Sequence, residues 1–399
     1  MTPKKILLLD TGNEWGGGTN SMFELLKRID RQRFAVTCAF YHDYPRGDSS
    51  LSRDLAAIGI PLTLLPQRRQ PAWAKLAKEL VRGVLTPWPA RRARAVRGID
   101  AIWRTRPNAA RIGALLRQGD FDLLYMNNQP LSNIEGYRAA EAAGVPTVQH
   151  CRIEPVLDAP TVALVNRLAK KVIGVSYGVV RTLTAQGVDE RRCVAVLNGI
   201  DPTQPLPDGA PLRATLGIPD DAVVFGTVGS LIARKSNHHV LEALARARLP
   251  GDWRLILVGE GREREALQQQ AVQLGLADKV IFAGFQREPL PWVAAMDVCI
   301  LASSSEGLPR VVLEAMLLSK PVIGSAVVGT RELIVDGETG LLYPYGDVAT
   351  LTAHLHPLAA NAALRRTLGE RGHARVCAHY TVQRYVCEVE AVLAEAARP

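Results

Sequence analysis

Residues 303–316 read SSSEGLPRVVLEAM, and this stretch decides how the whole chain is interpreted. The apolar run before it, Asp297 to Leu301, predicts a buried strand. Pro309 suits the first turn of a helix but not its interior, so a helix is predicted to begin there. The order strand, polar loop, helix is typical of open parallel sheets, where ligands bind at the carboxyl ends of the strands.

Two carboxylates in this stretch are candidates for ligand binding. Glu306 lies in the predicted loop, and Glu314 follows about a turn and a half into the predicted helix. Backbone N–H groups at a helix N-terminus attract phosphates, and a carboxylate can accept hydrogen bonds from both hydroxyls of a diol. The alternative is a capped helix whose first-turn acids face its dipole. That alternative accounts for Glu306 but poorly for Glu314, which lies beyond the first turn.

The stretch resembles the Glu-x7-Glu motif of the retaining GT4 glycosyltransferases, with Ser-Glu-Gly-Leu-Pro around the first glutamate and Glu-Ala-Met after the second. The resemblance implies the α/β fold called GT-B, in which two Rossmann-like domains with parallel sheets face a central cleft. It also implies that Glu306, with the amides of Gly307 and Leu308, holds the donor sugar, and that Glu314 holds the ribose. Retention at the anomeric carbon is implied by the resemblance alone.

The second half of the chain alternates between predicted strands and helices, which is typical of βα units and a parallel sheet. The strands are predicted at residues 223–228, 254–258, 280–282, 297–301 and 321–324. The first of them leads to Arg234 and Lys235, two adjacent cations that suit a diphosphate. A solvated pair in a loop is the weaker alternative. By resemblance this pair binds the donor diphosphate, and Ser230, Gly259 and Phe285 also contact the donor.

Three positions depart from the family pattern. Ser230 and Ser236 stand where arginine and glycine are common, and Arg310 stands where asparagine is common after the proline. Arg310 indicates either an unusual donor or a local salt bridge. None of these departures removes the Arg234–Lys235 pair.

The first half matches the family at fewer positions. Residues 4–10 predict an apolar strand, and a glycine-rich stretch, Thr11 to Asn20, separates it from a predicted helix. Because glycines let backbone amides approach an anion, this stretch is either a phosphate-binding loop or a flexible connection. The resemblance favours the first interpretation, with three glycines approaching the donor phosphates or the acceptor. They are Gly16, Gly17 and Gly18.

A histidine and a proline-rich stretch complete the first half. His150 lies at the carboxyl end of a strand predicted at residues 145–150, and by resemblance it orients the transferred sugar. A lone histidine is otherwise usually structural. Residues 201–211 contain four prolines, a composition typical of a linker. We therefore expect an acceptor-binding domain at 1–205, a donor-binding domain at 206–378, and a helix at 379–399 that crosses back, as in relatives.

One segment carries the basic excess of the chain. Residues 67–117 contain thirteen lysines and arginines against two acids, a net charge of +11, which leaves −2 for the rest of a chain whose total is +9. Trp73 and Trp103 lie there on two predicted amphipathic helices, and Trp88 lies in the break from Thr86 to Pro89 between them. A basic face with tryptophan anchors suits an anionic membrane surface. The alternative is a solvated face over a core stripe; nucleic-acid binding is weaker, since no known motif accompanies the segment.

The composition of the chain limits the number of domains, the membrane topology and the redox environment that can be expected. The 399 residues predict two or three domains, and the sequence has no apolar run of transmembrane length. Six scattered cysteines without a Cys-x-x-Cys pair, and the absence of a signal peptide, predict reduced thiols in a cytoplasm. We see no cluster of metal ligands and expect neither a metal nor a cofactor.

Together with the residues, the resemblance implies a retaining glycosyltransferase with His150, Glu306, Arg234 and Lys235 as its catalytic residues. Its expected donor is a UDP-sugar, with a GDP-sugar as second choice, and its acceptor a glycan or a lipid-linked glycan of bacterial surface polysaccharide or glycolipid synthesis. We expect it in the cytoplasm, peripheral at the inner face of the membrane. The alternative from another class is a catalytically silent nucleotide-sugar-binding protein, which loss of any of these four side chains would favour.

Overall fold

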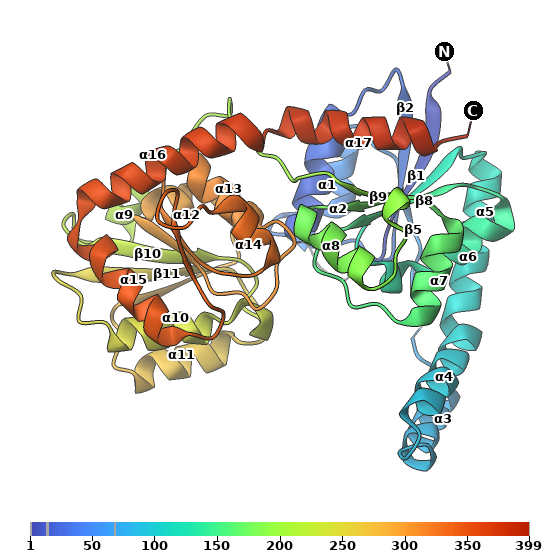
Figure 1. The fold of residues 1–399 in the computed structure, drawn as a ribbon, viewed down its shortest axis with the longest axis horizontal. Helices are drawn as coiled ribbons and strands as arrows, with labels where there is room; N and C mark the ends of the chain where they lie inside the picture. Colours follow the sequence, from blue (N-terminus) through green and yellow to red (C-terminus); the bar gives the residue numbers. More distant parts are fainter. Residues whose placement is uncertain (1, 13–15, 68, 399) are drawn as a thin grey trace.

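The computed structural model describes residues 2–12, 16–67 and 69–398 and contains two α/β domains side by side (Figure 1). Within these residues, a seven-stranded parallel sheet forms the first domain and a six-stranded parallel sheet forms the second. This confirms the predicted fold class. Four residues of interest lie outside the described residues: Asn13, Glu14 and Trp15 of the glycine-rich stretch, and Arg68 of the basic segment.

The first sheet is built around strand β1 (Lys4–Asp10), whose central residues Ile6 to Leu9 are fully buried because helices cover both faces. In spatial order its strands are β5 (Leu62–Leu64), β2 (Phe34–Phe40), β1, β6 (Leu123–Met126), β7 (Thr147–Cys151), β8 (Ala169–Gly174) and β9 (Cys193–Ala195). Asp10 pairs in register with Phe40, and Leu9 pairs with Met126. The side chains that follow β1 and β6 therefore meet at one edge.

Helices and one short hairpin complete the first domain. Its helices are α1 (Gly17–Arg28), α2 (Leu51–Ala57), α3 (Ala72–Val84), α4 (Pro89–Asp100), the π-helical η1 (Ala101–Thr105), α5 (Arg106–Gly119), α6 (Ile134–Ala143), α7 (Ala159–Leu168) and α8 (Tyr177–Ala185). The remaining elements are the strands β3 (Pro45–Arg46) and β4 (Ser49–Ser50) and the 3₁₀ turns η2 (Pro130–Asn133) and η3 (Glu190–Arg192).

The second sheet repeats the plan around strand β10 (Val223–Val228). In spatial order its strands are β12 (Val280–Gly284), β11 (Trp253–Val258), β10, β13 (Val298–Leu301), β14 (Val322–Ser325) and β15 (Leu341–Tyr343). Its helices are α9 (Ala210–Thr215), the 3₁₀ turn η4 (Ala233–Lys235), α10 (Asn237–Arg246), α11 (Arg264–Gln273), α12 (Leu290–Ala295), α13 (Arg310–Leu317), α14 (Val328–Leu333), α15 (Val348–Ala360) and α16 (Ala362–His379). The predicted order of strand, loop and helix around residue 306 is present as β13 and α13.

The last helix, α17 (Val382–Ala396), returns to the first domain along the top of Figure 1. Its buried residues Val389 and Leu393 join the core that also holds Ile6 and Leu8 of β1. At the crossing, Ile200 bridges Thr381, and a Cβ atom on Gly199 would lie 2.3 Å from the Thr381 carbonyl oxygen. The glycine therefore lets the two chain segments that join the domains pack closely.

Helices α3 and α4 form a hairpin that projects from the first domain (Figure 1). The apolar stripe of α3 faces outward: Trp73 is 49% exposed, Leu76 64%, Leu80 60% and Val84 69%. The stripe does not cover a core, which removes that alternative for α3.

The side of the hairpin facing away from the stripe is held by polar contacts. Lys78 Nζ lies 2.5 Å from Asp100 Oδ1 and 5.5 Å from the centre of the Trp103 ring, and Trp103 Nε1 donates to Asp100 Oδ1 at 2.8 Å. Trp103 is therefore part of the hairpin's internal packing, unlike the exposed Trp73 and Trp88. This corrects the expectation that all three tryptophans anchor the segment.

Candidate active site

Glu306 lies in the loop between β13 and α13, where the carboxyl ends of the second sheet meet the first domain. Pro309 caps α13, so the helix begins one residue after the predicted start. The Glu306 carboxylate is buried and accepts hydrogen bonds from Lys235 Nζ at 2.6 Å and Arg234 Nη1 at 3.1 Å. The structure thus brings together the predicted sugar-binding carboxylate and the predicted diphosphate-binding cations.

The electrostatics of this cluster follow from its contacts. Burial alone would raise the pKa of Glu306, but Lys235 and Arg234 outweigh burial and lower it. Arg234 also donates to the Ser305 carbonyl at 2.7 Å, which fixes the guanidinium beside the loop. The cluster keeps Glu306 ionised and places two cations where a diphosphate is expected.

Glu314 lies deeper, inside α13, and is also buried. Arg310 Nε lies 3.3 Å from Glu314 Oε1, and Arg310 Nη1 donates to the Gly199 carbonyl at 3.4 Å. Of the two interpretations of Arg310, the structure therefore contains the local salt bridge. Burial raises the pKa of Glu314, and Arg310 only partly opposes that rise.

The other predicted donor-binding residues line the same edge of the second sheet. Phe285 follows β12 and is exposed, and Ser230 follows β10. Gly259 has a packing reason of its own, because φ is +140° and a Cβ atom there would lie 2.0 Å from the Gly229 carbonyl oxygen. Ser236 adopts the left-handed region with φ of +49°, a conformation that explains why glycine is common at this position.

The predicted glycines of the first domain lie at the start of α1. Gly16 is its N-cap and offers no capping side chain, and a Cβ atom on Gly16 or Gly17 would meet no described atom within 4 Å. Gly18 is closer to its surroundings, since its Cβ would lie 3.3 Å from Arg152 Cγ. The Gly16 amide donates to Thr19 Oγ1 at 3.4 Å, and the open space beside the next amides of the first turn is suitable for an anion or a hydroxyl.

His150 lies within β7 and is fully buried rather than open to the cleft. Its Nδ1 lies 2.5 Å from the Tyr125 hydroxyl, and its ring lies between those of Tyr125 and Tyr385 of α17. Burial, assisted by the charge of Arg152, lowers the pKa of His150 well below its usual value, so the imidazole is neutral. Its Nε2 is buried without a hydrogen-bond partner among the described residues.

Three polar residues that the sequence did not single out as functional lie at the same edge of the first sheet. Asp10 ends β1 and is buried, and its carboxylate accepts from Asn127 Nδ2 at 2.6 Å and from the Gly12 amide at 2.7 Å. Arg152, one residue after β7, donates to Asn127 Oδ1 at 2.6 Å. None of them belongs to a motif, so only their position after a predicted strand could have identified them.

The two halves of the site touch at Gly307. A Cβ atom on this glycine would lie 2.2 Å from the Arg152 carbonyl oxygen, so the loop that follows Glu306 packs directly on the end of β7. Asn198 strengthens the contact by donating to the Leu308 carbonyl at 3.0 Å. The domains therefore meet beside the residues predicted to bind the donor sugar.

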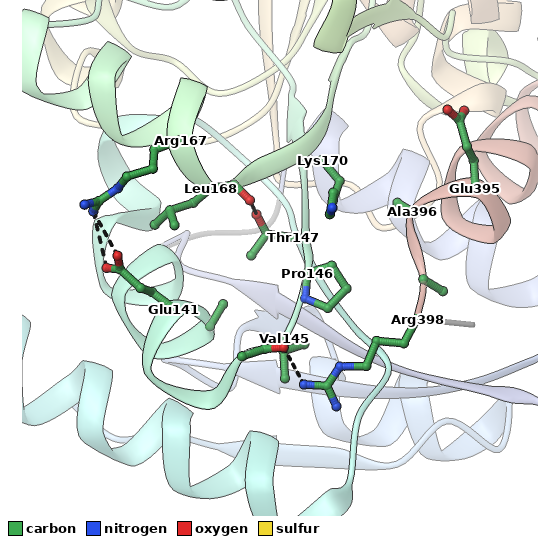
Figure 2. A pocket seen from close by; sticks show the side chains of 13 residues that line it. Glu141, Val145, Pro146, Thr147, Arg167, Leu168, Lys170, Glu395, Ala396 and Arg398 are labelled. Atoms are coloured by element: carbon green, nitrogen blue, oxygen red, sulfur yellow. Dashed lines mark hydrogen bonds and ion pairs between the residues drawn. The ribbon is translucent and has the colours of Figure 1, made fainter.

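A separate cavity of about 480 Å³ lies at the opposite edge of the first sheet. Figure 2 shows it between Pro146 and Thr147 at the start of β7, Lys170 of β8, and the C-terminal residues Glu395 and Arg398. Arg398 reaches the Gly144 carbonyl across it. Because ligands of parallel sheets bind at the carboxyl ends of the strands, this cavity is not the candidate active site.

Two family models match the chain in order. The model described as Glycosyltransferase Family 4 matches residues 15–204, and the one described as Glycosyl transferases group 1 matches residues 210–375.

Three curated proteins show the range of similarity. Two lipopolysaccharide core biosynthesis glycosyltransferases of Rhizobium meliloti (strain 1021) are similar: LpsE, 37% identical over 42% of this chain and 49% of its own length, and LpsD, 32% identical over 46% and 52%. A 2-deoxystreptamine glucosyltransferase of Streptomyces kanamyceticus is 27% identical over 75% of this chain and 85% of its own length. The chain spans about half the length of LpsE and LpsD in these matches.

Solved structures match over both domains. Anabaena Alr3699/HepE in complex with UDP-glucose has a TM-score of 0.78 at 23% identity, covering 98% of this chain and 99% of that one. A glycosyltransferase from Rickettsia africae ESF-5 also has a TM-score of 0.78, at 15% identity, with 99% of both chains covered. At these identities the likeness shows the fold, which is GT-B. With both family models matched in order on this fold, the chain belongs to the GT4 type of GT-B glycosyltransferases.

Proposed function

We propose that this protein transfers a sugar, with retention at the anomeric carbon, from a UDP-sugar to a glycan or lipid-linked acceptor in bacterial surface polysaccharide or glycolipid synthesis. The observation that carries the proposal is the contact of Glu306 with both Arg234 and Lys235 at the domain junction. The names of the similar proteins support it, since LpsE and LpsD act in lipopolysaccharide core biosynthesis and HepE was solved with UDP-glucose.

In this proposal each group of the cluster has a role that its contacts support. Arg234 and Lys235 neutralise the diphosphate as it leaves, which is where charge develops in the transition state. When the donor binds, Glu306 exchanges these cations for hydroxyls of the donor sugar, and Glu314 accepts from the ribose hydroxyls. His150, a neutral and fully buried imidazole whose Nε2 has no partner among the described residues, is proposed to orient the sugar from the first domain.

Thermal shift against UDP, GDP and ADP, each with its sugar esters, tests the donor assignment. A ligand that binds only the folded state raises the melting temperature, so UDP-sugars should give the largest shift. An equal response to all three nucleotides would contradict a specific UDP-sugar site.

Measuring turnover distinguishes the proposed enzyme from the catalytically silent nucleotide-sugar-binding protein. The wild-type protein should release UDP from the UDP-sugar that it binds, and the double variant Arg234→Ala/Lys235→Ala should lose this activity while its circular dichroism stays unchanged. Donor binding without UDP release in the wild type, tested with a panel of glycan and lipid-linked acceptors, would favour the silent protein.

We also propose that the hairpin of α3 and α4 docks the first domain on an anionic membrane at the cytoplasmic face, beside a lipid-linked acceptor. The outward stripe of α3 supplies apolar area, and the hairpin also carries exposed cations, among them Lys75 of α3 and Arg91 and Arg94 of α4. Arg91 lies 5.9 Å from the centre of the exposed Trp88 ring. Basic and aromatic residues around an apolar stripe are typical of helices that lie in a membrane interface. No helix among the described residues is long and apolar enough to cross a bilayer.

Co-sedimentation with vesicles tests this docking. Binding should be stronger to anionic than to neutral vesicles, since each cation near an anionic leaflet contributes about 1 kcal/mol, and it should weaken in 1 M salt. Leu76→Ser/Leu80→Ser should weaken binding, whereas Val272→Ser, at a similarly exposed apolar position of α11, should not. Equal binding to both vesicle types, or no salt effect, would contradict the electrostatic argument.

A further inference from the structure

We propose that Arg152 is a positioning residue that holds the donor-sugar loop, Glu306 to Leu308, against the carboxyl edge of the first sheet. The proposal rests on the proposed function, because it concerns the same site. Arg152 is 7% exposed and follows directly after β7. Its side chain lies between the two domains and α17, and it contacts residues from three separate parts of the chain.

The guanidinium uses all three of its nitrogens. Its Nε donates to Asn127 Oδ1 at 2.6 Å, Nη1 donates to Asn198 Oδ1 at 3.4 Å, and Nη1 and Nη2 both donate to the Tyr385 hydroxyl at 3.3 Å. Asn127 follows β6, Asn198 precedes the interdomain linker, and Tyr385 belongs to α17. A single planar group thus fixes the relative positions of three elements.

Toward the second domain, these contacts end on the donor-sugar loop. Asn198 receives the Arg152 hydrogen bond on its oxygen and donates its own amide to the Leu308 carbonyl at 3.0 Å. The Arg152 main chain acts on the same loop, because its carbonyl oxygen would lie 2.2 Å from a Cβ atom at Gly307. Side chain and backbone of one residue therefore set the position of the two residues that follow Glu306.

Toward the first domain, the contacts end on the glycine-rich stretch. Asn127 accepts from Arg152 and donates to Asp10 Oδ2 at 2.6 Å, and Asp10 Oδ1 accepts from the Gly12 amide at 2.7 Å. Arg152 also packs on α1, where Gly18 leaves room for its Cγ. A continuous hydrogen-bonded chain thus runs from Gly12 through Arg152 to Leu308, and so connects the two halves of the site.

The choice of arginine at a buried position favours a role beyond packing. The acceptors of its guanidinium among the described residues are two asparagine oxygens and a tyrosine hydroxyl, all neutral. The Asp10 carboxylate acts on this charge only at longer range, across Asn127, so burying the guanidinium is costly and a neutral side chain would fill the space more cheaply. What arginine adds is a rigid fork that reaches three acceptors at once, which lysine cannot reproduce although it keeps the charge.

Arg152→Lys tests the proposal, with Arg365→Lys as the matched control. Arg365 is a half-buried arginine that also donates to two groups, the Leu358 and Ala359 carbonyls, but it has no hydrogen bond to this chain of residues. In titration calorimetry with UDP, both variants should bind within about threefold of wild type. Turnover of the UDP-sugar found by thermal shift should fall at least tenfold in Arg152→Lys only, because misplacing the loop acts on the reacting sugar rather than on the nucleotide.

A double-mutant cycle of Arg152→Lys with Asn198→Ala measures whether the two residues act on turnover through the same contact, which a merely structural role of Arg152 does not predict. If both residues act through the Leu308 carbonyl, the double variant should lose little more turnover than the worse single variant. Additive losses, or wild-type turnover in Arg152→Lys, would overturn the proposal. If the wild type binds no nucleotide, the proposed function fails, but the positioning role can still be tested. The same double-mutant cycle is then measured on the urea midpoint of unfolding, and additive shifts of that midpoint would show that Arg152 and Asn198 are not coupled and would overturn the proposal.

Discussion

Glu306 and Glu314 carry the same side chain eight positions apart in one loop and helix, yet their pKa values shift in opposite directions. Both are buried, so burial raises both pKa values, and their neighbours decide the net result. Lys235 and Arg234 together outweigh burial at Glu306, whereas Arg310 alone does not at Glu314. The two glutamates should therefore respond differently to substitution and to pH.

We expect Glu306→Ala to lower turnover and Glu314→Ala to weaken nucleotide binding. Glu306 lies among the groups proposed to handle the sugar and its leaving group, whereas Glu314 lies in the helix behind them. Losing one charge-assisted hydrogen bond costs about 1.5–3 kcal/mol, roughly a ten- to hundredfold change. Titration with UDP and steady-state kinetics separate the two effects. Wild-type UDP affinity in Glu314→Ala would exclude the ribose role.

The pH dependence of UDP binding should report on Glu314. A protonated Glu314 offers fewer acceptors to a diol, so affinity should fall as the pH drops toward its raised pKa, above the range where an ordinary glutamate titrates. Glu314→Gln should bind more weakly but lack this component, and comparing the two proteins at each pH cancels the titration of UDP itself. Parallel pH profiles would contradict the assignment.

The same shifts fix the sign of two stability effects. The pKa of Glu306 is lowered on folding, so its contribution is present above the unfolded-state pKa and is lost as the pH falls through the folded value. The pKa of Glu314 is raised, so its effect is opposite, and the folded state gains stability as the pH falls through its folded value.

Apart from His150, the sequence predicted individual site residues where a motif surrounded them. Glu306 was identifiable because Gly-Leu-Pro and a helix start follow it. Asp10 and Arg152 also form buried hydrogen bonds at the carboxyl edge of the first sheet, but each is a single polar residue at the end of an apolar run. Their roles arise from Asn127, Asn198 and Tyr385, which are distant in sequence, and periodicity carries no information about such contacts.

At the scale of elements, periodicity predicted the helices of the basic segment but not which way they face. A helical stripe shows that apolar side chains share one side, and it does not show what covers them. In the hairpin, the Lys78–Asp100 ion pair and the Trp103 ring hold the helices together, so the stripe of α3 is left outside. Polar substitutions in this stripe should therefore affect stability much less than they would in an amphipathic helix whose apolar side faces a core.

We expect Leu76→Ser/Leu80→Ser to change the free energy of unfolding by no more than about 0.5 kcal/mol per substitution, because exposed positions contribute little to folding. Leu244→Ala, in the buried face of α10, should cost about 2–5 kcal/mol, because it leaves a cavity in the core. Urea unfolding measures both. A large loss in the α3 variant would mean that its stripe is covered in solution, and would contradict the exposed hairpin.

At the scale of the whole molecule, the fold class followed from the alternation of strands and helices, but the contacts between domains did not. Glu332 of α14 is an example: its carboxylate accepts from the backbone amides of Tyr177, at 2.9 Å, and Gly178. These amides open helix α8 of the first domain, so a carboxylate from one domain caps a helix of the other. In the sequence Glu332 is part of a helical pattern with no sign of a partner 154 residues away.

This contact predicts how the cleft is held closed. Glu332→Ala removes the cap, and Gly178→Ala should force the same surfaces apart, because a Cβ atom there would lie 2.3 Å from Val328 Cγ1. A charge-assisted contact of about 1.5–3 kcal/mol shifts a closed–open equilibrium roughly ten- to hundredfold. Small-angle X-ray scattering should therefore show a larger radius of gyration for both variants than for Glu338→Ala, an exposed control in the same domain. If both variants keep the wild-type radius, the cap does not hold the domains together, and the junction at Gly307 and α17 must suffice.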